Sequence, residues 1–119
     1  MFKRRAGEAG ERRAETFLKR NGLKFVARNW HCRHGEIDLI MLDEEWLVFV
    51  EVRLRTPRGF ANSAESVDFR KQRKLAQAAS YYLASNPVWQ TRPCRFDVVG
   101  IEGDTGELAW IRQAFEAPG

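Results

Sequence analysis

The chain has 119 residues, 44% of them hydrophobic, and a mean hydropathy of -0.50, values typical of a single globular domain, which we expect to span residues 1–119. No apolar run approaches the roughly 20 residues that a membrane helix needs. The basic start of the chain lacks the apolar stretch of a secretory signal, so we expect a cytoplasmic protein with no membrane partner. The net charge of +4 suits an anionic partner such as nucleic acid.

The first predicted helix runs from about Gly7 to Asn21, and Gly22 follows it as a C-terminal stop. Its apolar positions recur at helical spacing, at Gly10, Ala14, Phe17 and Leu18. Glu11 lies beside this stripe, so it can lean over the sheet as an additional acid of a site. Acids also favour the first turns of a helix because of the helix dipole, and both interpretations of Glu11 stay open. We expect Glu15 to be a solvated partner of neighbouring cations.

The next segments predict a three-stranded antiparallel meander. Leu23 to Trp30 is the first predicted strand, and residues 35–42 and 47–53 flank a polar turn as a hairpin. Pairing residue 42 with residue 47 places Asp38 opposite Glu51 and leaves one face uniformly apolar. That face holds Ile37, Leu39, Met41, Val48, Val50 and Val52. Pairing 42 with 46 would separate the two acids, so the hydrophobic pattern favours the first register.

In this register Glu36, Asp38, Glu51 and Arg53 form a polar cluster at the open end of the hairpin. Two facing carboxylates repel each other unless a cation lies between them or one is protonated. A hard divalent metal takes carboxylate, carbonyl and water oxygens, which predicts a Mg²⁺ or Mn²⁺ site at Asp38, Glu51 and the Val52 carbonyl. Such a metal beside Arg53 is suited to phosphodiester hydrolysis. The alternative is a structural network with an ion pair between Glu36 and Arg53.

A basic loop leaves this cluster directly after Arg53 and contains Arg55 and Arg58 beside Pro57 and Gly59. One interpretation is that the loop closes over a phosphate backbone. The other is that it is a simple connector, which is the commoner role of a Pro-Gly loop.

The second predicted helix begins near Ser66 or Asp68 and ends at Ser85 or Asn86, because Pro87 cannot continue it. Its first turns carry four cations, Arg70, Lys71, Arg73 and Lys74. Cations near a helix N-terminus oppose the helix dipole, and a bound polyanion would relieve this. We therefore predict phosphate contacts from Arg70, Lys71 and Lys74, with a solvated helix face as the alternative.

The last predicted strands are residues 94–102 and a short edge strand at residues 107–111. Asp97 lies between apolar residues, on the face opposite Phe96 and Val98. A buried acid needs a partner, and we expect an Arg or Lys of the second helix or of the preceding loop.

Asp38, followed thirteen residues later by Glu51-Val52-Arg53, resembles the signature of the PD-(D/E)xK nucleases, with arginine at the lysine position. Nearly the whole chain also resembles the YraN family of bacterial proteins. The matching features are Gly10-Glu11, Asn29-Trp30, Gly35-Glu36-Ile37-Asp38-Leu39-Ile40, Val50-Glu51-Val52-Arg53, the helix from Lys71 through Leu75 to Tyr82-Leu83, and Arg95-Phe96-Asp97-Val98-Val99. The resemblance implies a restriction-endonuclease-like αβββαβ fold, a central mixed sheet of four to five strands flanked by two main helices, similar to archaeal Holliday-junction resolvases.

The resemblance further implies catalytic roles for Asp38, Glu51, Arg53 and Glu11, nucleic-acid binding with DNA favoured over RNA, and a homodimer. A guanidinium stays charged and cannot act as the general base that a lysine can become, although it can hold a phosphate or orient a water. Two functions follow from this. The first is a Mg²⁺- or Mn²⁺-dependent endonuclease acting on structured DNA. The alternative is an inactive nucleic-acid-binding or assembly module that retains the nuclease fold.

Overall fold

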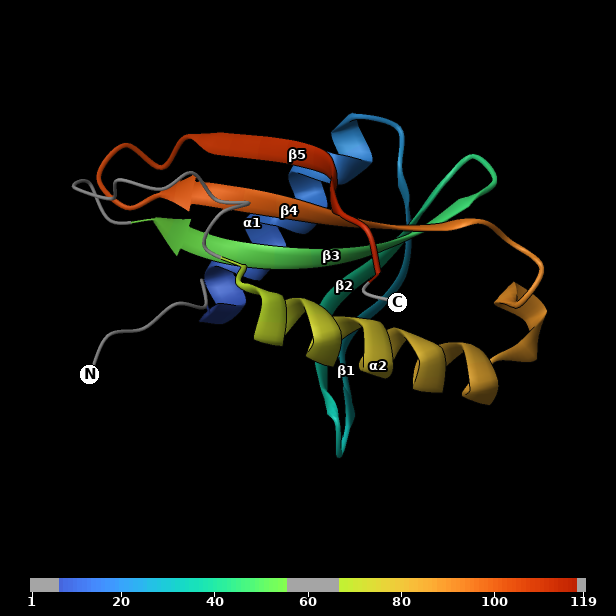
Figure 1. Cartoon of the computed structure of the whole chain (residues 1–119). Coiled ribbons are helices and arrows are strands. Elements are labelled where there is room, and N and C mark those ends of the chain that lie inside the picture. Colours follow the sequence, from blue (N-terminus) through green and yellow to red (C-terminus); the bar gives the residue numbers. More distant parts are fainter. Residues whose placement is uncertain (1–6, 56–66, 118–119) are drawn as a thin grey trace.

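The structure is a computed structural model that describes residues 7–55 and 67–117. These residues form an α/β fold in which a mixed five-stranded sheet is flanked by two helices (Figure 1). The elements in chain order are α1 (Gly7–Arg20), β1 (Lys24–Cys32), β2 (Gly35–Asp43), β3 (Trp46–Arg55), α2 (Phe69–Ser85), the short 3-10 helix η1 (Pro87–Trp89), β4 (Cys94–Glu102) and β5 (Leu108–Phe115). The order and the layers confirm the predicted restriction-endonuclease-like αβββαβ fold.

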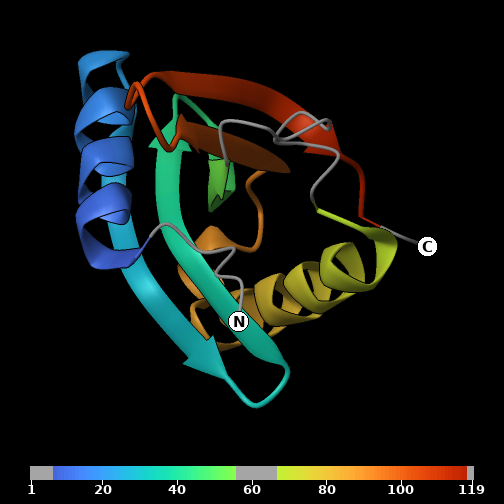
Figure 2. The same cartoon turned by 90° about the vertical axis from the view of Figure 1, so that its left-hand side faces the viewer.

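The sheet has the strand order β1-β2-β3-β4-β5. Neighbouring strands are antiparallel except β3 and β4, which run parallel. A parallel pair needs a crossover connection, and α2 supplies it by packing on one face of the sheet. The other helix, α1, covers the opposite face, so the sheet is the middle of three layers (Figure 2).

The β2–β3 hairpin has the predicted register. Leu42 pairs with Leu47, and the ladder continues to Leu39 and Val50. The next positions along the two strands are Asp38 and Glu51, which places the acids at the end of the paired region.

Each sheet face carries its own hydrophobic cluster. Phe49, Leu75 and Phe96 belong to the cluster under α2, whereas Leu18 and Val50 belong to the cluster under α1. The faces of β3 and β4 therefore match the predicted alternation of side chains.

Ile37 was predicted to share a face with Leu39, but it packs in the cluster under α2. The β2–β3 ladder ends at Leu39, and the Asp38 carboxylate accepts the N–H of Val52 at 2.9 Å. The alternation on which the prediction for Ile37 rested does not extend beyond the end of the ladder.

Both helices end close to the predicted residues. Gly22 takes a φ of +96° just after α1, a left-handed conformation that suits glycine. The N-cap of α2 is Asp68, whose carboxylate accepts the N–H of Lys71 at 2.9 Å. None of the helices formed by residues 7–55 and 67–117 is long and apolar enough to span a membrane.

Glu15 differs from its prediction, because only 5% of this residue is exposed. Its carboxylate forms ion pairs with Lys19 and with Arg28 of β1, each at 3.0 Å. Burial raises the pKa of Glu15, but the hydrogen bonds and charges of the two cations outweigh it and lower the pKa overall. Glu15 therefore ties α1 to the edge strand β1.

Candidate active site

Asp38 and Glu51 converge at the end of the β2–β3 hairpin, and each is only 2% exposed. Burial raises the pKa of Glu51, and the nearby negative charge of Asp38 raises it further, from the ordinary value of 4.5 to about 7. The structure therefore brings together the two carboxylates that the sequence analysis selected.

Two cations reach Glu51 from different elements. Arg53 Nη1 lies 3.0 Å from Glu51 Oε2, and Lys71 Nζ of α2 lies 3.8 Å from the same oxygen. The cations lower the pKa of Glu51, but burial and Asp38 outweigh them. We call Asp38, Glu51, Arg53 and Lys71 the acid site. The Arg53 side chain is 9% exposed and that of Lys71 is 29% exposed, so Lys71 lies between the acids and solvent.

The position of Lys71 is the feature that the sequence analysis missed. The sequence indicated only that Lys71 belongs to a basic helix N-terminus. Asp68 fixes the first turn of α2 by accepting the N–H of Lys71, and the crossover from β3 brings this turn beside Glu51. A lysine twenty residues after an acid carries no local sequence signal for such a contact.

The side-chain contacts of Glu36 and Arg53 bear on the alternative of a structural network. Glu36 pairs with His31 Nδ1 at 3.2 Å, across the β1–β2 hairpin. Arg53 pairs with Glu51 on its own strand. The Arg53 guanidinium therefore contacts the buried carboxylate of Glu51.

Replacing Glu51 with glutamine is expected to stabilise the protein at pH 8.5 but not at pH 4. Between 4.5 and about 7 the folded state binds more protons than the unfolded state, so stability falls as pH rises through this range. The difference between 4.5 and about 7 corresponds to about 3 kcal/mol of unfolding free energy, which Glu51→Gln should recover above pH 7. Urea unfolding at both pH values measures this. If Glu51 is instead a structural ion-pair partner, the variant will be less stable at pH 8.5.

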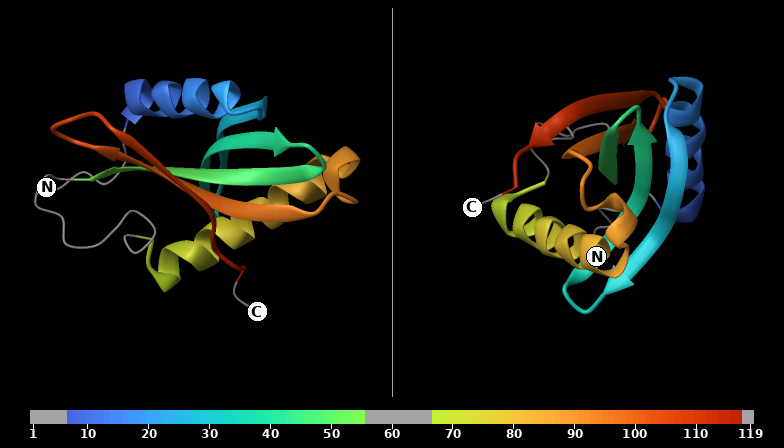
Figure 3. Two further views of the ribbon diagram at one scale, coloured as in Figure 1. Left: turned by 90° about the horizontal axis from the view of Figure 1, so that it is seen from above. Right: turned by 90° about the vertical axis from the view of Figure 1, so that its right-hand side faces the viewer.

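Glu11 is 5% exposed on α1, which packs on the sheet face of Val50 and Val52. The first turns of α1 lie towards the end of β3 that carries the acid site (Figure 3). Within residues 7–55 and 67–117, no three His, Cys, Asp or Glu side chains converge as metal ligands, so Glu11 does not form a common ligand set with Asp38 and Glu51. Its role as an additional acid stays a prediction.

The predicted phosphate-binding cations have different positions. Arg70 and Lys74 are exposed on α2, one turn apart and close in sequence to Lys71. Arg55 is the last residue of β3, and the structure describes its backbone. Arg58 lies outside the described residues. The described part of the predicted basic surface is therefore the first half of α2.

Asp97 is fully buried, as predicted, but its partners lie on β4 and β5, not on α2 or the preceding loop. It binds Arg95 Nε at 3.0 Å, Trp110 Nε1 at 2.9 Å and the N–H of Gln113 at 2.9 Å. The prediction was wrong because Asp97 lies on the sheet face opposite α2. The strand β5, which supplies two of the partners, extends to Phe115, beyond the predicted residues 107–111.

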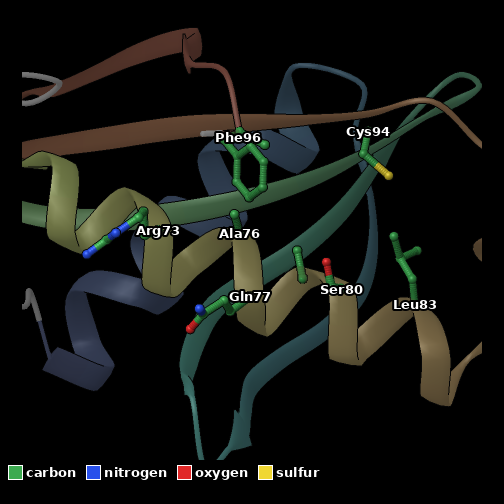
Figure 4. A pocket seen from close by; sticks show the side chains of 9 residues that line it. Arg73, Ala76, Gln77, Ser80, Leu83, Cys94 and Phe96 are labelled. Carbon is green, nitrogen blue, oxygen red and sulfur yellow. The ribbon is translucent and has the colours of Figure 1, made fainter. Parts of the chain in front are cut away.

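A pocket of about 410 Å³ lies between α2 and β4 (Figure 4). Ala79 and Phe96 are among its apolar lining residues, and Arg73 and Gln77 are among the polar ones. Burial raises the pKa of the Cys94 thiol in this pocket, which disfavours the reactive thiolate. The residues that line the pocket do not include those of the acid site.

The comparison with known proteins assigns a family to this fold and site. The model of the uncharacterised protein family UPF0102 matches residues 10–101. A UPF0102 protein of Pseudomonas syringae is 48% identical over 118 residues, which cover 97% of this chain and 96% of the relative. A UPF0102 protein of Ectopseudomonas mendocina is 50% identical over 113 residues, covering 93% of this chain and 94% of the relative. The chain therefore belongs to the family UPF0102, also called YraN, as its sequence features predicted.

Proposed function

We propose that this protein binds nucleic acid and is a nuclease-like enzyme whose acid site uses Mg²⁺ or Mn²⁺ to hydrolyse phosphodiester bonds in structured DNA. The observation that carries the proposal is the buried pair of Asp38 and Glu51, with the pKa of Glu51 raised to about 7. Strongly raised pKa values of buried acids beside specific charge partners are typical of functional sites.

The donors of the acid site suit a hard divalent cation. Asp38 and Glu51 offer carboxylate oxygens, and the Val52 carbonyl is the predicted additional ligand. The raised pKa of Glu51 indicates that Arg53 and Lys71 do not fully balance two ionised acids in the interior. When bound, the metal supplies positive charge for the phosphoryl oxygens and lowers the pKa of a coordinated water.

The formal charge of the acid site bears on how it would attract a substrate. With both carboxylates ionised, the formal charges of Asp38, Glu51, Arg53 and Lys71 sum to zero, although the two cations do not offset the cost of burying the acids. A divalent cation would make the site doubly positive and therefore attractive to a phosphodiester.

Arg53 and Lys71 have separate roles in this proposal. Arg53 holds Glu51 through one guanidinium nitrogen, and the geometry of its planar fork suits phosphate oxygens. Lys71 supplies, from α2, the ammonium group that the nuclease signature places at position 53. Its partial exposure lets it contact a backbone that lies over the acid site.

The test is cleavage by purified protein of labelled four-way, flap, nicked and duplex DNA, with RNA in parallel. We expect cleavage that requires Mg²⁺ or Mn²⁺ and stops with a chelator. No cleavage of any substrate with either metal would contradict the enzymatic part of the proposal.

A second candidate function is nucleic-acid binding without hydrolysis, and Arg53 is the observation that favours it. A guanidinium cannot take over the proton-transfer role of the signature lysine. If this function is correct, binding persists without cleavage, and Arg53→Lys remains inactive.

The exposed cations of α2 give a prediction about binding. Arg70→Gln/Lys74→Gln is expected to reduce the slope of log binding constant against log salt by about 2, because two phosphate contacts are lost. Arg92→Gln/Lys24→Gln is the matched control, since it removes the same charge far from the first turns of α2. Equal slopes for wild type and the α2 variant would exclude these residues from the interface.

A further inference from the structure

A second cationic cavity lies on the other side of the molecule, between α1 and the start of β5. It has a volume of about 310 Å³. Its lining residues are Arg12, Arg13, Thr16, Phe17, Arg20 and Leu108. We call these residues the α1 groove. The start of β5 passes beside α1 on the sheet face opposite α2 (Figure 2).

Two features form the α1 groove: the helical spacing of its residues and a hydrogen bond from Arg13 to the turn before β5. Arg12, Thr16 and Arg20 recur every fourth residue, so they share one flank of α1. Arg13 donates from Nη2 to the carbonyl oxygen of Gly106 at 2.6 Å. Gly106 has a φ of +76°, and a Cβ there would lie 3.4 Å from Arg13 Nη1, so the turn before β5 is in contact with this guanidinium.

The cations of this flank are poorly compensated. Lys19 of the same helix already has a partner, because the buried carboxylate of Glu15 pairs with it and with Arg28. Among the described residues, the one carboxylate that forms an ion pair with a groove arginine is that of Glu8, which lies 3.9 Å from Arg12. Both side chains of that pair are largely exposed, and such pairs contribute little. An anion can therefore displace Glu8 readily.

We propose that the α1 groove binds the phosphodiester backbone of a nucleic acid, as a second contact surface on the face opposite α2. The inference rests on the proposed nucleic-acid binding. Arg13 and Arg20 are seven residues apart, or about 10 Å along the helix. Measured along the axis of a DNA duplex, that length equals the rise of about three nucleotides of one strand, at about 3.4 Å each, so the two guanidinium groups can contact different phosphates.

The other lining residues suit the same ligand. Thr16 offers a hydroxyl donor, which is a common phosphate contact. Phe17 and Leu108 supply an apolar floor against which a sugar can pack. Phe17 is held by an edge-to-face contact with Trp110 at 6.2 Å between ring centroids.

The consequence is a protein with cationic surfaces on both sheet faces. A single straight duplex has difficulty in contacting both surfaces at once, whereas the arms of a branched DNA can do so. The α1 groove therefore gives a physical basis for a preference for structured DNA.

The experiment compares salt-dependent binding of a labelled four-way DNA junction by full-length variants. Arg12→Gln/Arg20→Gln removes two groove cations and retains Arg13, which holds the turn. Lys24→Gln/Arg92→Gln is the matched control, because it removes the same charge from exposed residues outside α1. We expect the groove variant to lower the salt slope by about 2, and the affinity at moderate salt by about tenfold, while the control changes both far less. Thermal unfolding checks that all variants are folded.

The Arg70→Gln/Lys74→Gln variant, measured in parallel, separates the two proposals. If this α2 variant lowers the salt slope and the groove variant matches its control, the α1 groove proposal is wrong and the proposed function stands. If only the groove variant lowers the slope, α1 and not α2 carries the backbone contacts. If the wild type shows no salt-dependent binding, both proposals fail.

Discussion

Asp38→Asn is expected to reduce metal-dependent cleavage by at least about a hundredfold while the protein remains folded. The substitution removes one of the two negative ligands of the proposed metal. Asparagine retains an oxygen that can accept the N–H of Val52, which Asp38 accepts at 2.9 Å in the structure. Initial cleavage rates with saturating Mn²⁺ measure the effect, and circular dichroism measures folding.

Glu45→Gln is the matched control for this result, because Glu45 is an exposed acid in the turn of the same hairpin. The Glu45→Gln variant should cleave DNA at the wild-type rate. Asp38→Ala is a less informative variant, because it leaves the buried N–H of Val52 without its acceptor and is expected to cost about 1–3 kcal/mol of stability. Wild-type cleavage by Asp38→Asn would remove Asp38 from the mechanism.

Asp97→Ala is expected to lower the unfolding free energy by about 3–5 kcal/mol, because it leaves the nearly buried Arg95 without a main partner. Arg95 also pairs with Asp43 at 2.8 Å, but Trp110 Nε1 and the N–H of Gln113 lose their acceptor. Urea unfolding measures the change.

Asp104→Ala is a suitable control for Asp97→Ala, because Asp104 is an exposed acid in the turn between β4 and β5. This control should change stability by less than about 0.5 kcal/mol. A loss below about 1 kcal/mol in Asp97→Ala would mean that the hydrogen-bonded cluster is not what holds β5 on the sheet.

The sequence predicts the core of the fold because local signals agree there. In the segment of residues 35–53, only one hairpin register places the apolar side chains together on one face of the sheet. The structure has that register. Asp68 and Pro87 mark the ends of α2 through capping and through the missing N–H of proline. Asp38 and Glu51 are recognisable because acids within apolar strands need a physical reason.

Other features depend on long-range contacts that no local pattern encodes. The partners of Asp97 come from β5, so they depend on which strand becomes the neighbour of β4. Lys71 reaches Glu51 only because the crossover brings the first turn of α2 to the end of β3. Glu15 is buried because Arg28 of β1 lies beside α1. The prediction for Ile37 failed because Asp38 ends the regular ladder.

The ionised form of Glu51, which the proposed metal site requires, lowers the stability of the folded protein. Ionised Glu51 is unfavourable in the folded protein because burial and the charge of Asp38 raise its pKa to about 7. A divalent cation would remove the cost, so metal binding and folding should be coupled at neutral pH. Glu51→Gln should therefore be more stable than the wild type without metal and should gain no stability from Mn²⁺.

Calorimetric titration of Mn²⁺ into the wild type and into Asp38→Asn at pH 7 tests the central claim most directly. The two acids of the hairpin should bind one common ion in the wild type. Because the pKa of Glu51 is about 7, binding should release part of a proton, and the measured heat should change with the ionisation enthalpy of the buffer. Asp38→Asn should give no such heat. The absence of binding heat in the wild type, or the same isotherm in both proteins, would contradict a shared metal site.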